Sequence, residues 1–307
     1  MNSLSPSYWR GFGKLADPRL TLASLSSMLI GAAAAARNGP VNWAWLAATV
    51  VGIVALEIAK NASGEITDFD SGADAAVTAD DRSPFSGGRR VIVDGLLTRT
   101  ETRNIAALTY AVGIGIGIVI AAFCDARVLW IGLGGTALAW LYAGFPCRMA
   151  YRGLGELAVA VAYGPLICSG TYVVQRHALP WTVILLSLPV GLLIAAFLWI
   201  NEFPDYKADL AARKLNLVAR LGRARASHWF AIILLAAFAI QCLLPAYAFP
   251  RGVWLGLAGI PFSWAAARRA IRSPDATSLI INAQRWTLES FVILAIGTAA
   301  GLVLAGR

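Results

Sequence analysis

Long, uninterrupted runs of apolar residues limit what this chain can fold into more than any other feature. A helix of about 20 apolar residues is long enough to cross the hydrocarbon core of a bilayer. The runs are continuous rather than alternating, so they favour membrane helices over the strands of a β-barrel. Only 14% of the residues are charged, whereas soluble domains contain roughly 25%. The sequence therefore predicts an all-α, polytopic membrane protein with about nine spans, at residues 20–37, 41–60, 105–123, 128–146, 156–175, 180–200, 229–247, 252–267 and 287–305.

The distribution of positive charge indicates how these spans cross the membrane. If the N-terminus lies inside, the inner segments hold most of the 26 Lys and Arg residues. This positive-inside bias predicts that the N-terminus and both long loops face the cytoplasm of a cell (inner) membrane. The net charge of +9 is explained by topology and anionic lipid, so nucleic acid binding is not needed to account for it. Each outer segment holds a single basic residue, namely Arg37, Arg127, Arg176, Arg251 and Arg307.

The acidic residues gather on the same side as the basic ones. Of the 17 Asp and Glu residues, only Asp125 falls in an outer segment. Acidic residues contribute little to membrane topology, so their one-sided clustering needs another cause. We therefore expect a functional site at the cytoplasmic face, built from the inner loops 61–104 and 201–228.

The second of these loops, NEFPDYKADLAARKLNLVARLG at 201–222, begins where an apolar run ends. Asn201, Asp205 and Asp209 follow one another at steps of four, which places them on one face of a helix. Carboxylate and amide oxygens are ligands that suit Mg²⁺, and basic residues suit an anion bound with the metal. The spacing therefore predicts a site for a magnesium-bound diphosphate. The basic residues that follow are Lys207, Arg213, Lys214 and Arg220.

The first loop repeats this arrangement about 140 residues earlier. If the second span continues as a helix beyond residue 60, Asn61, Glu65 and Asp68 share one face. Acids at the C-terminal end of a helix oppose its dipole, so a positive partner must compensate for them. Arg89 and Arg90 follow two glycines that can turn backbone donors toward an anion. Two such clusters facing each other could hold two Mg²⁺ ions bridged by diphosphate oxygens.

Simpler interpretations exist for several of these residues. The first loop could be a solvated acidic loop that caps its helix, and Asp205 and Asp209 could pair with Lys207 and Arg213 along the helix, at about 0.3–0.5 kcal/mol per pair. Neither interpretation explains why the arrangement occurs twice. The tyrosines and arginines of the connection near residues 142–152 could be anchors at headgroup depth. Glu57 is an intramembrane acid, which is costly enough to suggest a function.

These motifs resemble the UbiA superfamily of intramembrane prenyltransferases, in particular its menaquinone-type branch, the dihydroxynaphthoate polyprenyltransferases. The second loop resembles the second Asp-rich motif of that branch nearly throughout. The first, NASGEITDFDSGAD at 61–74, is similar to the family's NxxNDYxDxxxGxD. YRGLGEL at 151–157, GP at 164–165, GTY at 170–172 and RVIVDGLLT at 90–98 are also similar. The resemblance covers essentially the whole chain, so it implies one UbiA-like domain over residues 1–307, with the helices enclosing a cytoplasm-facing cavity.

Two positions depart from the pattern of that branch. Gly64 and Glu65 stand where the branch usually has Asn-Asp, so one amide is lost and the ligating arm is longer. Arg213 stands where a Gly is common. Both changes leave the family resemblance intact and bear on the particular substrate.

The resemblance implies a mechanism in which Mg²⁺ assists ionisation of an allylic prenyl diphosphate and an electron-rich aromatic acceptor of the quinone-precursor kind is alkylated. Tyr142 is then a candidate for contacting the cation or the acceptor, and Asp68, Asp205, Asp209 and Tyr142 form the catalytic set. The residues implied as metal ligands are Asn61, Glu65, Asp68, Asn201, Asp205 and Asp209. The residues implied to bind diphosphate are Arg89, Arg90, Arg152, Lys214 and Arg220.

Two other functions compete with aromatic prenyl transfer. A UbiA-type terpene cyclase would ionise the same diphosphate and let the cation close on its own double bonds without an acceptor. A transporter would use the acids as a cation site, but such acids lie near the middle of the bilayer, whereas these lie at predicted helix ends. The sequence does not separate aromatic prenyl transfer from the terpene cyclase.

Overall fold

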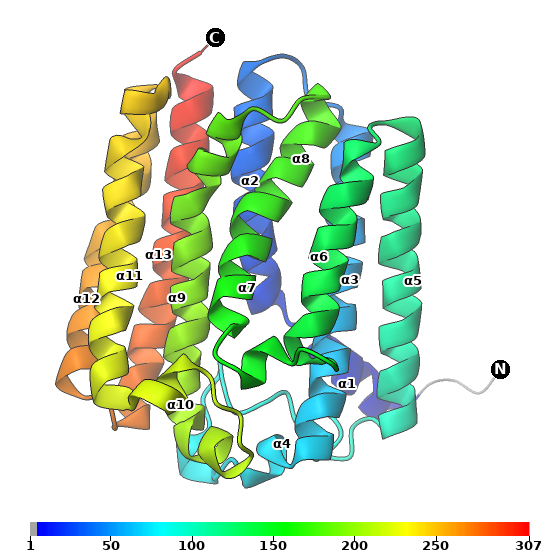
Figure 1. Ribbon diagram of the computed structural model, residues 1–307, viewed down its shortest axis with the longest axis vertical. Coiled ribbons are helices and arrows are strands. Elements are labelled where there is room, and N and C mark those ends of the chain that lie inside the picture. Colours follow the sequence, from blue (N-terminus) through cyan, green and yellow to red (C-terminus); the bar gives the residue numbers. More distant parts are fainter. Residues whose placement is uncertain (1–4, 307) are drawn as a thin grey trace.

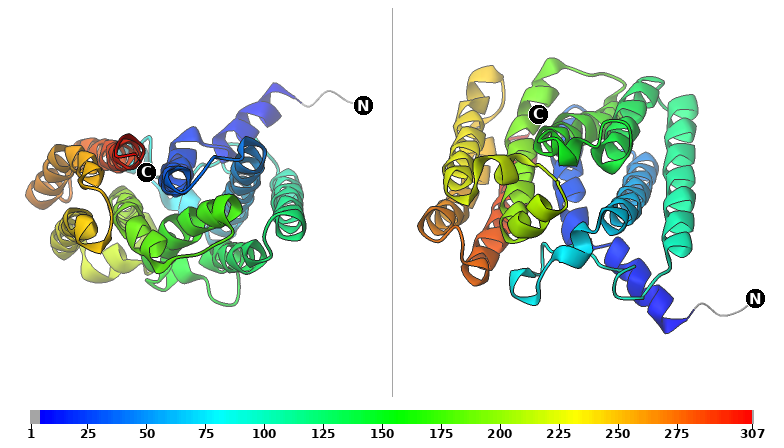
Figure 2. Two further views of the ribbon diagram at one scale, coloured as in Figure 1. Left: turned by 90° about the horizontal axis from the view of Figure 1, so that it is seen from above. Right: turned by 60° about the horizontal axis from the view of Figure 1, so that its bottom comes forward.

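The computed structural model describes residues 5–306, and its regular elements are all helical. The long helices run roughly along one axis and form a bundle (Figure 1). Seen end-on, α11–α13 lie at one side of the bundle and α5 and α6 lie at the other (Figure 2). The first half of the chain comprises α1 (Pro6–Leu15), α2 (Pro18–Arg37), α3 (Trp43–Ser71), α4 (Ala73–Ala76), η1 (Ala79–Asp81), α5 (Arg99–Phe123), α6 (Arg127–Ala143) and η2 (Met149–Tyr151). The second half comprises α7 (Gly155–Val161), η3 (Ala162–Leu166), α8 (Ile167–Arg176), α9 (Trp181–Ala211), α10 (Leu217–Leu221), α11 (Arg223–Leu243), η4 (Leu244–Tyr247), η5 (Arg251–Gly259), α12 (Ile260–Arg272) and α13 (Thr277–Leu304).

The all-α membrane class is confirmed. Among the described residues, six helical segments are long and apolar enough to cross a bilayer, and residues 21–37 form a shorter apolar helix. The remaining predicted spans fall on α6, which has 17 residues, and on the η5–α12 segment, which begins as a 3₁₀ helix. The count of nine spans therefore stays a prediction, although each predicted span lies on helix.

The connections gather at the two ends of the bundle as the charge pattern predicts. At the end that holds α4 and α10 (Figure 1), Lys14 pairs with Asp94 and Thr277 donates to Asp81. At the opposite end, Arg127 donates to the carbonyl of His177, 2.9 Å away. Segments predicted to share a side of the membrane thus share an end of the bundle. The orientation of that end toward the cytoplasm remains a prediction.

Helix α9 lies at the centre of the packing. Its apolar window is 72% buried inside the bundle, more than that of any other candidate span in the described chain. Close approach to η3 depends on small residues, because a Cβ on Gly191 would lie 2.9 Å from the Cα of Gly164. Small residues allow membrane helices to pack backbone against backbone. The second polar motif therefore begins on a helix that its neighbours hold firmly.

The ends of α3 and α9 are set by residues in the left-handed conformation. Gly72, with φ of 77°, ends α3. Beyond α9, Arg213 has φ of 54°, and the backbone N–H of Lys214 donates to the carbonyl of Asp209 at 2.7 Å. This is the hydrogen bond that closes a helix C-terminus when the chain turns back on it. The turn directs Lys214 toward the end of its own helix.

The conformation of Arg213 gives a prediction about stability. Arg213→Gly should raise the free energy of unfolding by about 0.5–1 kcal/mol, because the left-handed conformation costs a non-glycine residue roughly 1–2 kcal/mol and glycine returns part of that as backbone entropy. Arg213→Ala is the control, since it removes the side chain but keeps the Cβ. Thermal unfolding in detergent measures both variants, and equal midpoints for the two would contradict the argument.

Candidate active site

A cavity of about 1150 Å³ opens where α3, α4 and α9 end. Its wall includes α1, Lys214 and the loop of residues 82–96. The lining combines acids from the helix ends with bases from the loops, and a site of this kind can bind a cation together with an anion. The acids are Asp17, Glu65, Asp68, Asp74, Asp94, Glu202, Asp205 and Asp209, and the bases are Arg10, Lys14, Lys60, Arg82, Arg89, Arg90 and Lys214.

The first motif has the helical spacing expected from the sequence. Helix α3 continues unbroken to Ser71, so Asn61, Glu65 and Asp68 all line the cavity. Each is held by a contact from another segment, which fixes its side chain. Leu15 accepts a hydrogen bond from Asn61 Nδ2 at 2.8 Å, and Glu65 Oε1 accepts one from the backbone N–H of Ile92 at 3.2 Å. Tyr151 donates its hydroxyl to Asp68 Oδ1 at 2.7 Å.

Asp74 is a site residue that our sequence analysis missed. It lies just after the turn at Gly72, is 4% exposed and lines the cavity. Burial and the nearby charges of Asp68 and Glu65 raise the pKa of Asp74 to about 8, so a further negative charge is poorly stabilised in this cluster. Its place in NASGEITDFDSGAD was the available signal, because it follows Asp70 by four residues. Asp70 itself turns outward and pairs with Arg99 at 2.8 Å.

Lys214 joins the two motifs. Its ammonium nitrogen lies 3.6 Å from Asp68 Oδ2 of the first motif and 3.8 Å from Asp209 Oδ1 of the second. Burial by itself lowers the pKa of Lys214, but these two carboxylates outweigh it and raise the pKa well above its ordinary value. Asn216 holds the other oxygen of Asp209 at 2.7 Å. The simpler interpretation, in which Asp209 pairs with Lys207, does not hold, because Lys207 pairs with Asp81 at 3.7 Å.

The donor set fits a hard cation such as Mg²⁺. Within residues 5–306, five buried side-chain oxygens of cavity residues lack a hydrogen-bond partner: Asn61 Oδ1, Asp74 Oδ2, Asn201 Oδ1, Glu202 Oε2 and Asp205 Oδ1. Leaving a buried polar atom unpaired costs about 1–3 kcal/mol, so a set of them indicates a missing ligand. No three acidic, His or Cys side chains of the described chain form a metal site by themselves. A cation here needs further oxygens from Asn, water and the anion.

The predicted anion-binding residues divide into two groups. Arg89, Arg90 and Lys214 line the cavity. Burial lowers the pKa of Arg89, although nearby carboxylates counteract this, and its buried Nε has no partner among the described residues. Arg90 donates to the backbone carbonyl of Asp74 and pairs with Asp94 at 3.2 Å, so it also braces the loop. Arg152 and Arg220 have exposed side chains and do not line the cavity.

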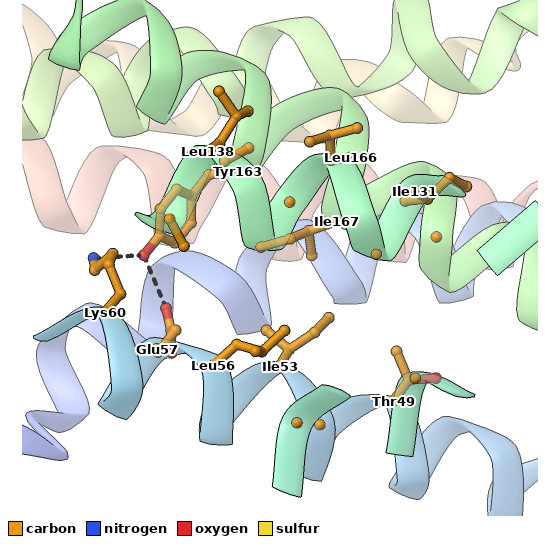
Figure 3. A pocket seen from close by; sticks show the side chains of 18 of the residues that line it. Thr49, Ile53, Leu56, Glu57, Lys60, Ile131, Leu138, Tyr163, Leu166 and Ile167 are labelled. Carbon is orange, nitrogen blue, oxygen red and sulfur yellow. Dashed lines mark hydrogen bonds between the residues drawn. The ribbon is translucent and has the colours of Figure 1, made fainter. Parts of the chain in front are cut away.

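A second, apolar pocket adjoins the cavity. It has a volume of about 170 Å³ and lies between α3, α5, α6 and the α7–α8 segment. Aliphatic side chains from α3, α6 and α8 surround most of it, and Glu57, Lys60 and Tyr163 stand at one end (Figure 3). Lys60, Tyr142, Val159 and Tyr163 line both spaces. The predicted residue Tyr142 therefore lies at the boundary between the polar cavity and the apolar pocket.

The chain is similar to known proteins over nearly its whole length. The UbiA prenyltransferase family matches residues 24–303. The 1,4-dihydroxy-2-naphthoate octaprenyltransferase of Mycobacterium tuberculosis is 30% identical over 288 residues, which are 94% of each chain. Two solved structures share the fold. The apo UbiA homologue of Aeropyrum pernix K1 has a TM-score of 0.68 at 19% identity, with 91% of this chain and 96% of that chain covered. The UbiA homologue of Archaeoglobus fulgidus bound to GPP and Mg²⁺ has a TM-score of 0.66 at 15% identity, with 96% and 98% covered.

The glycine pair before Arg89 gives a prediction about how the cavity is built. Gly87 and Gly88 both have positive φ, but a Cβ on Gly88 would lie 2.0 Å from Asp74 Oδ1, whereas one on Gly87 would make ordinary contacts from 3.4 Å. Both alanine variants carry the backbone strain, and only Gly88→Ala also collides with Asp74. We expect the free energy of unfolding of Gly88→Ala to be about 1–3 kcal/mol lower than that of Gly87→Ala. Thermal unfolding compares the two variants, and equal losses of stability would show that a Cβ at position 88 does not collide with Asp74.

Proposed function

The chain belongs to the UbiA prenyltransferase family, and from this premise we propose that it transfers an isoprenyl group from an allylic prenyl diphosphate to a hydroxylated naphthoate. Diphosphate is the leaving group, and the product is a prenylated aromatic of the quinone-precursor kind. One observation supports this most strongly. Two carboxylate motifs, 140 residues apart, line one cavity and share Lys214 between Asp68 and Asp209. The relative in Mycobacterium tuberculosis supports the class of acceptor.

We propose that the reaction depends on Mg²⁺. The ligands are drawn from Asn61, Glu65, Asp68, Asn201, Asp205 and Asp209, with Asp74 added from the structure. The unpaired oxygens of Asn61, Asp74, Asn201 and Asp205 support this, as does the homologue from Archaeoglobus fulgidus bound to GPP and Mg²⁺. When bound, Mg²⁺ supplies positive charge that neutralises the diphosphate and makes it a better leaving group.

The bases of the cavity act on the same diphosphate. Arg89 and Lys214 are partly buried cations beside the carboxylates, and fixed charges in a partly buried site stabilise a departing anion more than they would in water. Lys214 is held between Asp68 and Asp209, so it is oriented before substrate arrives. Arg90 braces the loop that carries Arg89. Arg152 and Arg220 lie outside the cavity lining, and we leave them out of this diphosphate set.

The apolar parts of the site serve the isoprenoid and exclude water. Ile194, Phe197 and Leu198 of α9 form an apolar wall of the cavity, and burial of each CH₂ of a prenyl chain on such a wall is worth about 0.8 kcal/mol. A dry wall also keeps water from the allylic cation. Tyr142, at the boundary of the two spaces, has an aromatic face suited to a cation. The positive-inside pattern leads us to place the cavity mouth at the cytoplasmic side of the cell membrane.

The paired-motif site gives a prediction with a matched control on the same helix. Asp68→Asn and Asp205→Asn should each lower kcat/KM for the prenyl diphosphate at least about 100-fold, the scale seen when one charge-stabilising group is removed. Asp70→Asn removes a carboxylate that points away from the cavity and pairs with Arg99, so we expect a change of less than about threefold. Diphosphate release measures all three. Full activity of both site variants would refute the shared site.

The products separate prenyl transfer from the competing cyclase function. Purified protein is incubated with geranyl, farnesyl or geranylgeranyl diphosphate and Mg²⁺, with and without 1,4-dihydroxy-2-naphthoate. We expect a prenylated naphthalene only with the acceptor, loss of product in EDTA, and recovery when Mg²⁺ is restored. Mass spectrometry identifies the products. A cyclic hydrocarbon or alcohol formed without acceptor would replace the transferase proposal with the cyclase.

A further inference from the structure

Glu57 is a carboxylate inside the membrane part of the bundle that the proposed metal and diphosphate sites do not use. It lies on α3 one turn before Asn61, is 7% exposed, and lines the apolar pocket (Figure 3). Intramembrane acids are costly and are kept where they serve a function. Its neighbours in the pocket are otherwise mostly aliphatic, so the carboxylate is the main polar feature of that space together with Lys60 and Tyr163.

Neighbouring side chains fix one oxygen of Glu57 and leave the other open. Oε1 accepts hydrogen bonds from Ser24 Oγ of α2 and from the Tyr163 hydroxyl, the latter at 3.0 Å. Lys60 in turn donates to the Tyr163 oxygen at 3.3 Å. Oε2 is buried and has no hydrogen-bond partner among the residues that the structure describes. The group is therefore oriented, with one acceptor position unused.

Tyr163 owes its position to a local irregularity of the helix. Residues 162–166 form a π-helical turn, η3, that contains Pro165. Such turns interrupt the regular helix and are frequent at functional sites. Here the turn places the Tyr163 ring where both the pocket and the cavity reach it. Ser24 of α2 and Tyr163 of η3 thus converge on Glu57 from two other segments, and Lys60 of α3 holds the Tyr163 hydroxyl from behind, as in a built binding site.

An unused carboxylate oxygen in an apolar pocket is satisfied by a ligand that brings a hydrogen-bond donor on an apolar body. An isoprenoid chain has no such donor. A hydroxylated aromatic ring has one, and its flat apolar surface suits the aliphatic lining. The cavity already offers an apolar wall on α9 for the prenyl chain, so the smaller pocket is free for the second substrate.

We propose that this pocket, between α3, α6 and η3, binds the aromatic acceptor, and that Glu57 Oε2 accepts a hydrogen bond from one of its hydroxyl groups. The inference rests on the proposed prenyl transfer and adds the place and the contact by which the acceptor is selected. Because the pocket and the cavity share Tyr142 and Tyr163, the ring of the acceptor lies beside the site where the allylic carbon is freed. The donated hydrogen bond also increases electron density on the ring.

The test measures binding, so that it does not depend on turnover. Dissociation constants of 1,4-dihydroxy-2-naphthoate and of its dimethyl ether are measured anaerobically, with purified protein, Mg²⁺ and a prenyl thiodiphosphate. The ether cannot donate a hydrogen bond. The ratio of the dissociation constant of the ether to that of the dihydroxy compound therefore reports the hydroxyl contact. Glu57→Gln keeps the shape of the side chain but can offer its NH₂ group to either ligand. Comparing ratios between proteins cancels the intrinsic differences between the ligands.

We expect the ratio to fall roughly 10- to 100-fold in Glu57→Gln, the effect of one hydrogen bond to a charged group. Thr49→Val is the matched control, because the Thr49 hydroxyl lies at the other end of the pocket and bonds to the Trp45 carbonyl of its own helix. It should keep the ratio of the unaltered protein. An unchanged ratio in Glu57→Gln would overturn the inference.

A second variant tests the occupant of the pocket without altering Glu57. Gly135 of α6 lines the pocket, and a Cβ there meets nothing within 4 Å, so Gly135→Leu fills the space. We expect acceptor binding to weaken more than tenfold while the thiodiphosphate binds as before. If binding of the thiodiphosphate weakened instead and binding of the acceptor did not, the pocket would be assigned to the prenyl chain and the inference overturned. If the unaltered protein makes no prenylated product, the proposed function itself fails, which is distinct from either outcome.

Discussion

Two long helices of this protein end in carboxylates at the end where the helix dipole is negative. Acids there are destabilised by about 0.3–1 kcal/mol each at an exposed site, and here they lie partly or fully buried beside other acids. The arrangement is stable only with compensating positive charge. Lys214 supplies part of it by lying between Asp68 and Asp209. Burial and the charges of Asp68 and Glu65 raise the pKa of Asp74, so another carboxylate in this cluster is poorly stabilised. The loop of residues 82–96 brings further basic side chains, Arg82, Arg89 and Arg90, to the same cavity.

Most of the fold could be predicted from the sequence because lipid leaves few alternatives. Apolar runs must be helical in a bilayer, and the one-sided charges indicated which connections share an end. The lengths of individual spans were less predictable. Helix α3 runs 11 residues past its predicted apolar limit of 60 to Ser71, since its polar continuation is buried by contacts such as Asn61 with Leu15. Contacts between distant segments of this kind leave no periodic signal.

The site was predictable where its residues follow helical spacing and less so where loops place them. Asn61, Glu65, Asp68, Asn201, Asp205 and Asp209 all line one cavity. Arg152, just after η2, and Arg220, on the short helix α10, are exposed and lie outside the cavity, while the loop of residues 82–96 folds Arg89 inward. Glu65 shows how a departure from a family pattern is accommodated. Its longer arm reaches the backbone N–H of Ile92 and so ties the first motif to that loop.

The polar cavity and the apolar pocket meet at side chains that have both kinds of surface. Tyr142 and Tyr163 present aromatic faces and hydroxyl tips, and Lys60 has an aliphatic stem and a charged end. Such residues can line a dry space on one side and a charged one on the other. A reaction that separates diphosphate from an apolar cation needs this boundary, because the anion is stabilised only among charges and the cation survives only away from water. Under the proposed function, the reaction takes place between these two environments, and the acceptor that we propose at Glu57 completes the apolar side.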